Sequence, residues 1–118
     1  MLLESDLLIA YFKKEDWLKK TAEKIIQRIE EKRLDNIQIS TEVFHELYYV
    51  FSDYAPAHVI MANEARLATI KNLEFIEARP ETYISSMNIM ETYSLTSIFD
   101  AIYAATALGV DVPDHTII

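Results

Sequence analysis

The sequence predicts an α/β protein, a three-layer α/β/α fold in which helices cover both faces of a small, mostly parallel sheet. Two observations support this prediction. Short apolar or alternating segments of strand length occur at residues 1–4, 36–40, 73–78 and 114–118, and longer segments of helical character separate them. Strands that alternate with helices are joined by crossover connections, which pair the strands in parallel and place helices on the sheet faces.

The helices are predicted over residues 7–12, 16–33, 42–54, 56–71, 80–93 and 98–108. The second is the clearest, because apolar side chains from Trp17 to Ile29 recur at helical spacing opposite Lys and Glu. Ser40 or Thr41 offers an N-cap for the third helix and Ser97 for the last. The starts of the third and last helices therefore each have a chemical signal.

The composition is that of one ordinary globular domain covering residues 1–118, with 51% apolar and 25% charged residues. The absence of cysteine excludes disulfides and thiolate metal sites, and it makes a reducing, cytoplasmic location the simplest expectation. No apolar run approaches the roughly 20 residues that a membrane span needs, and the N-terminus lacks the basic region of a secretory signal. We expect a cytoplasmic protein with no membrane association.

The net charge of −8 argues against binding nucleic acid by phosphate neutralisation alone, because that mode needs an excess of Lys and Arg. A phosphodiester can instead be bound through metal ions that the protein's own carboxylates hold. Such a site is acidic by necessity, so the acidic residues become the candidates.

Two acids, Glu4 and Asp6, flank Ser5 where the first predicted strand ends. In α/β sheets, ligands bind outside the carboxyl ends of the strands, which is where this pair lies. The alternative is that both are solvated residues that favour the dipole of the following helix. The pair alone does not separate these interpretations.

Glu46 lies at the border of the apolar side of the helix predicted over 42–54, so its carboxylate should be partly buried and face a cleft. From this helix alone, a solvated border face is the more ordinary interpretation. His45 points away from the apolar side, and we expect it at the surface.

Asp100 is the only charge in residues 97–108, which are apolar almost all the way round the helix and so predict a buried element. A buried carboxylate without partners is unstable by several kcal/mol, so it requires a cation or strong donors. The alternative is a capping pair with Ser97 in the first turn.

Acids from these three segments can meet at one sheet edge, where they would repel one another unless a divalent cation neutralised them. Oxygen ligands suit Mg²⁺ or Mn²⁺, and such a metal promotes hydrolysis of a phosphodiester.

Three stretches of the sequence resemble the motifs of the PIN-domain family of bacterial and archaeal metal-dependent nucleases, which includes the VapC-like toxins. They are "LLESDLLIAYF" (2–12), "ISTEVFHELYYVF" (39–51) and "LTSIFDAIYAATAL" (95–108), in the family's order and spacing. The resemblance implies catalytic Asp6, Glu46 and Asp100, and metal binding by these three with Glu4. It also implies supporting roles for Ser5 and Ser40, and Mg²⁺ or Mn²⁺ as cofactor.

The resemblance implies an endoribonuclease that hydrolyses RNA and acts as the toxin of a toxin–antitoxin pair. It also implies that the chain forms a homodimer. Two departures from the family pattern leave an alternative, a catalytically weak or inactive module that binds RNA or protein. Glu4 stands where the family usually has Asp, and the sequence stops at Ile118, near the start of the family's fourth acidic motif, so the C-terminal end of the fold is expected to be lacking. A phosphoacceptor receiver domain is disfavoured, because no Lys follows Lys71.

Overall fold

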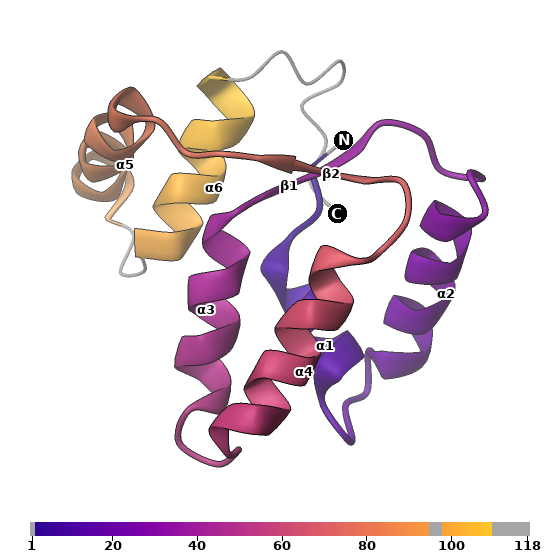
Figure 1. The fold of residues 1–118 in the computed structure, drawn as a ribbon. Helices are drawn as coiled ribbons and strands as arrows, with labels where there is room; N and C mark the ends of the chain where they lie inside the picture. The colour runs from indigo at the N-terminus through magenta and orange to yellow at the C-terminus, as the bar shows by residue number, and fades with distance from the viewer. Residues whose placement is uncertain (1, 95–97, 110–118) are drawn as a thin grey trace.

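The computed structural model describes residues 2–94 and 98–109 of the chain (Figure 1). The expected strand at 114–118 and the expected cap at Ser97 lie outside these residues. The described elements are α1 (Ser5–Phe12), α2 (Lys19–Glu30), β1 (Ile37–Ser40), α3 (Glu42–Phe51), α4 (Ala57–Ala68), β2 (Leu73–Ile76), α5 (Pro80–Tyr93) and α6 (Ile98–Gly109). The α/β class is confirmed, and within the described residues each predicted helix is present.

The strands β1 and β2 pair in parallel, with Ile37 opposite Leu73 at one end and Ser40 opposite Ile76 at the other. The first predicted strand is present only as a parallel bridge between Leu2 and Gln38. This bridge puts the N-terminal segment on the side of β1 away from β2, so β1 lies between the two. The N-terminal segment then leads directly into α1.

Alternation along the strands separates the two faces of the sheet. One face presents side chains to the core shared by α1 to α4, namely Ile37, Ile39, Leu73 and Phe75. The other face turns Gln38 and Ile76 toward a cavity that Ala105 and Thr106 of α6 also line. Figure 1 accordingly shows α5 and α6 together on one side of the sheet and α1, α2 and α4 on the other. Helices therefore cover both faces, as predicted.

The turn before α2 differs from the prediction, since the helix begins at Lys19 and not at residue 16. Asp16 accepts a hydrogen bond from the Leu18 backbone at 2.8 Å, which holds these residues in a turn. Trp17 lies in this turn with 88% of its surface exposed, so its expected place in the apolar stripe is wrong. Helical spacing does not apply to a residue that precedes the helix.

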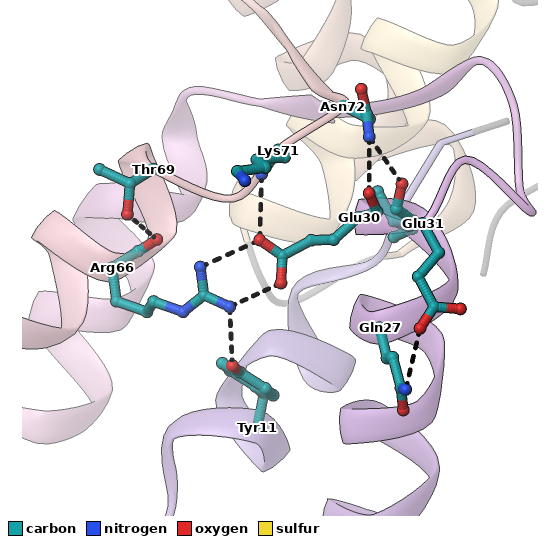
Figure 2. Close-up of polar contacts among 9 residues, drawn as sticks. Tyr11, Gln27, Glu30, Glu31, Arg66, Thr69, Lys71 and Asn72 are labelled. Atoms are coloured by element: carbon teal, nitrogen blue, oxygen red, sulfur yellow. Dashed lines mark hydrogen bonds and ion pairs between the residues drawn. The ribbon is translucent and has the colours of Figure 1, made fainter.

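A polar network fastens the end of α2 to the loop between α4 and β2 (Figure 2). Arg66 of α4 donates from both terminal nitrogens to the Glu30 carboxylate, at 3.3 and 2.8 Å. Asn72 adopts a positive φ of 65° and donates to the carbonyls of Ile29 and Glu30 at 3.2 and 3.0 Å, which satisfies two acceptors at the helix end. Asparagine tolerates the left-handed conformation that this turn needs.

Within residues 2–94 and 98–109, no helix combines the length and the apolar character that crossing a bilayer requires.

Candidate acidic active site

The first acidic pair lies at the N-terminus of α1, which follows the segment bridged to β1. Glu4 is the N-cap residue in extended conformation, and Asp6 is exposed in the first turn. The neighbouring Leu3 and Leu8 are buried in the core and hold this end of the helix in place. Both carboxylates therefore project from a well-anchored helix start, where the dipole favours negative charge.

Glu46 is partly buried on α3 and accepts a hydrogen bond from the hydroxyl of Tyr103 at 2.5 Å. Tyr103 belongs to α6 and is only 5% exposed. Ser5 of α1, also buried, hydrogen-bonds the same hydroxyl. Burial first, and then the bond to Glu46, raise the pKa of Tyr103 well above its usual value, so the phenol remains a donor. A series of interacting side chains, Ser5, Tyr103 and Glu46, thus connects the three helices that carry the candidate acids.

Of the four predicted carboxylates, Glu4 is affected electrostatically by the other three. Burial raises the pKa of Glu4 above 4.5, and the negative charges of Asp6, Asp100 and Glu46 raise it further, in that order. The structure therefore brings acids from α1, α3 and α6 to one region, although they are far apart in the sequence. Like charges in such proximity destabilise the fold unless a cation is present.

The carboxylates are not arranged as a ready-made metal cage. Within the part of the chain that the structure describes, no three His, Cys, Asp or Glu side chains form a group that could hold a metal ion as they stand. The donor atoms are nevertheless carboxylate oxygens, which hard divalent cations prefer. The chemistry of the set suits Mg²⁺ or Mn²⁺.

Asp100 is exposed in the first turn of α6, so the expectation of a carboxylate on a fully buried helix is wrong. Among residues 98–106 of this helix, the buried ones are Ala101, Ile102, Tyr103, Ala105 and Thr106. At about 100° per residue, they leave uncovered the side that carries Asp100 and the partly buried Ala104. The prediction of burial was wrong because alanine counts as apolar in the sequence pattern, although an alanine side chain can lie at the surface as well as in the core.

Ser40 is fully buried at the end of β1, and its hydroxyl accepts a hydrogen bond from the Glu42 backbone at 3.2 Å. This bond satisfies one of the unpaired N–H groups at the start of α3. Ser40 therefore determines where α3 begins, and Glu46 follows one turn later. Thr41 occupies the N-cap position without a side-chain capping bond.

Glu42 is a further carboxylate at the start of α3 that the sequence pattern does not single out, and it is only 7% exposed. It accepts a hydrogen bond from the Tyr83 hydroxyl of α5, and its other oxygen lies 3.2 Å from Nδ1 of His45. The hydrogen bond to Glu42 is the main cause that raises the pKa of Tyr83. The spacing of Glu42 and His45, three residues on one helix, was the available signal for this pair. His45 itself is exposed, as expected.

An aromatic pair was also overlooked beside the acids. Tyr49 of α3 and Phe99 of α6 have ring centroids 6.3 Å apart at an interplanar angle of 56°. Neither helix carries a Lys or Arg, because most of the chain's basic residues occur between Lys13 and Arg33. On α3 and α6, the acids are therefore accompanied by aromatic and not by basic side chains.

Comparison with known proteins agrees with this architecture. The family model described as PIN domain matches residues 1–113. The fold is similar to the crystal structure of Mycobacterium tuberculosis VapC20, a sarcin-ricin loop cleaving toxin, with a TM-score of 0.71 and 15% identity over 92% of this chain and 81% of that one. It is also similar to a toxin–antitoxin complex from Klebsiella pneumoniae, with a TM-score of 0.59 and 21% identity over 91% of this chain and 77% of the other. No curated protein matches the chain. Because the family model spans almost the whole sequence, the chain belongs to the PIN-domain family.

Proposed function

We propose that the chain is a divalent-metal-dependent endoribonuclease. The observation that carries the proposal is that α1, α3 and α6 bring Glu4, Asp6, Glu46 and Asp100 to one region, where burial and then the charges of the other three acids raise the pKa of Glu4. Carboxylates gathered in this way are destabilising in isolation, and a divalent cation removes the repulsion. Membership of the PIN-domain family supports a nuclease over other metal-dependent hydrolases.

The chain's own residues have separable roles in this proposal. Asp6, Glu46 and Asp100 are the catalytic acids and, with Glu4, would hold Mg²⁺ or Mn²⁺. Such an ion, when bound, supplies polarisation of a phosphoryl oxygen and a lowered pKa for water.

Two side chains position one of these acids. Tyr103 directs Glu46 through its hydroxyl, and Ser5 orients that hydroxyl in turn.

We further propose that this activity is that of a cytoplasmic toxin restrained by an antitoxin, as a homodimer. Support comes from the fold neighbours, which are described as a toxin and a toxin–antitoxin complex. Helix α5 supports a protein partner, because it buries only Ser86 while it leaves Tyr83, Ile84 and Met87 exposed. Glu81 and Glu91 on the same helix favour a basic partner segment.

The nuclease is tested by incubating single-stranded RNA with the protein and Mg²⁺ or Mn²⁺, with and without a chelator. Cleavage should require the cation and should fall by more than about 100-fold in Asp100→Asn, since even outer-shell substitutions at metal sites cost about 10–100-fold. The matched control is Asp53→Asn, an exposed acid beyond the end of α3, which should cleave like the wild type. Equal cleavage by Asp100→Asn and the wild type would remove the activity from this site.

A catalytically weak or inactive RNA-binding module is the second candidate. It is favoured by the absence of a preformed metal-holding group among the described residues and by Glu at the position where the family usually has its first Asp. The same experiment distinguishes the two, because this candidate binds the RNA without divalent-dependent cleavage.

A further inference from the structure

We propose that Tyr49 and Phe99 form a stacking surface for a nucleobase of single-stranded RNA, beside the phosphate that the acidic site receives. The inference rests on the proposed function, since it assigns the part of the substrate that lies next to the reacting bond. It makes Tyr49 and Phe99 substrate-binding residues.

The positions of the two rings follow from the packing of α3 against α6. Tyr103 meets Glu46, while Phe99, one turn earlier on α6, meets Tyr49, three residues later on α3. The helices therefore run antiparallel here, with a polar contact and an aromatic contact at successive turns. A rise of about 1.5 Å per residue puts Tyr49 roughly 4.5 Å along α3 from Glu46. Phe99 directly precedes Asp100, so the rings border the acids on both helices.

The exposure of the pair suits a ligand better than a packing role alone. Tyr49 is 73% exposed, whereas Phe99 is partly buried. The tilt of 56° between the planes makes this a partial contact that leaves most of the Tyr49 ring in solvent. Phe99 thus braces Tyr49 from one side, and the open side of the ring remains accessible.

The charge distribution identifies the occupant. Because α3 and α6 contain no Lys or Arg, neutralisation of the phosphate backbone cannot supply affinity from these helices. Stacking of bases on aromatic rings needs no positive charge and tolerates any base. Bases inside a duplex are not available for such stacking, whereas those of single strands can be splayed out. A single-stranded RNA base is therefore the ligand that fits an aromatic surface bordering acids.

The test is a double-mutant cycle between the protein and its RNA. Affinity is measured by fluorescence anisotropy, without divalent cation, for wild type, Tyr49→Phe and Tyr49→Leu. The probes are a labelled single-stranded oligoribonucleotide and versions of it with one abasic position at each site in turn. Cleavage kinetics with Mn²⁺ are measured for the same proteins. The matched control is Tyr48→Leu, which removes an exposed tyrosine from the same helix about 100° around its axis.

Tyr49→Leu should weaken binding or raise KM by roughly 5- to 30-fold, toward the low end of what one base–aromatic stack supplies because leucine keeps some apolar contact. Tyr48→Leu should retain wild-type behaviour. Tyr49→Phe should restore most of the affinity that Tyr49→Leu loses, since the ring remains. One abasic position should weaken binding to the wild type but not to Tyr49→Leu, because the base it lacks is the one that Tyr49 stacks.

Each other result overturns a specific statement. Cleavage with the wild-type KM in Tyr49→Leu overturns the stacking surface and leaves the nuclease intact. Tyr49-dependent binding without any cleavage keeps the stacking surface and overturns the nuclease. Absence of both RNA binding and cleavage in the wild type overturns both. An equal loss in Tyr48→Leu and Tyr49→Leu overturns the assignment to this pair.

Discussion

Tyr103 shows how one side chain can serve both packing and the candidate site. Its ring is buried in α6, and its hydroxyl accepts from Ser5 and donates to Glu46. A carboxylate held in this way loses less conformational freedom when it binds a cation. The hydroxyl is therefore expected to matter more for metal affinity than for folding.

Tyr103→Phe should reduce the affinity for Mn²⁺ by about 10-fold, at the low end for an outer-shell partner of a metal ligand. The ring stays in place, so the packing of α6 is preserved, while Glu46 loses the donor that orients it. Calorimetric titration of the apo-protein measures this directly. Tyr93→Phe, which alters an exposed tyrosine at the end of α5, is the control and should bind Mn²⁺ like the wild type. Unchanged affinity in Tyr103→Phe would contradict the positioning role.

At the scale of elements, the network around Glu30 joins α2 to α4 and to the loop between α4 and β2, and it contains none of the candidate acids (Figure 2). The hydrogen bond from Arg66 is the main cause that lowers the pKa of Glu30 below 4.5. A folded-state pKa below the unfolded one stabilises the fold at pH values above the unfolded pKa. This stabilisation is lost as pH falls through the folded pKa.

Glu30→Gln should therefore lower the free energy of unfolding at pH 7 by about 0.5–1 kcal/mol, the range for a partly exposed ion pair. The difference from wild type should shrink as pH falls below the unfolded pKa and vanish once pH lies below the lowered folded pKa, where the wild-type carboxylate is also protonated. Urea unfolding at several pH values measures both. The neighbouring Glu31→Gln is the matched control and should change stability little, because it removes an exposed ion pair with Arg33 and keeps an amide oxygen as acceptor for Gln27. A deficit that persists unchanged at low pH would show that charge is not the cause.

At the scale of the whole molecule, the acidic region should couple metal binding to stability. Burial of Glu4, and then repulsion from Asp6, Asp100 and Glu46, raise the pKa of Glu4 and disfavour the folded apo-protein with these carboxylates charged. A ligand that binds only the folded state stabilises it, by about 2.7 kcal/mol at a concentration 100 times its Kd. The fold and the metal are thus expected to support each other.

Mg²⁺ or Mn²⁺ should raise the Tm of the wild type in a concentration-dependent way, and the rise should be much smaller in Asp100→Asn. Differential scanning fluorimetry across a cation titration measures this, with Na⁺ at equal ionic strength as the control for screening. Asp53→Asn should follow the wild type. A shift of equal size in all three proteins would mean that the cation acts through general screening and not at the acidic site.

Local patterns determined much of this architecture. The alternation of residues 37–40 and 73–76 and the amphipathic helices predict a parallel sheet between helical layers, and the order of elements agrees. Such predictions succeed because side-chain periodicity is set by the backbone repeat of each element. Trp17 is a failure of the same logic, since periodicity carries no information about where a turn replaces the first turn of a helix.

The sequence by itself determined the fold class and identified the acids of the candidate site, Glu4, Asp6, Glu46 and Asp100. Acids that interrupt apolar segments can be recognised from the local sequence, without knowledge of how the helices pack. Only the tertiary structure decided that Asp100 faces outward, that Tyr103 connects Ser5 to Glu46, and that Tyr49 meets Phe99. These contacts join helices separated by about half of the chain, for α3 and α6, or by most of it, for α1 and α6. Their geometry depends on how α3 and α6 pack against each other, a long-range property that no local spacing encodes.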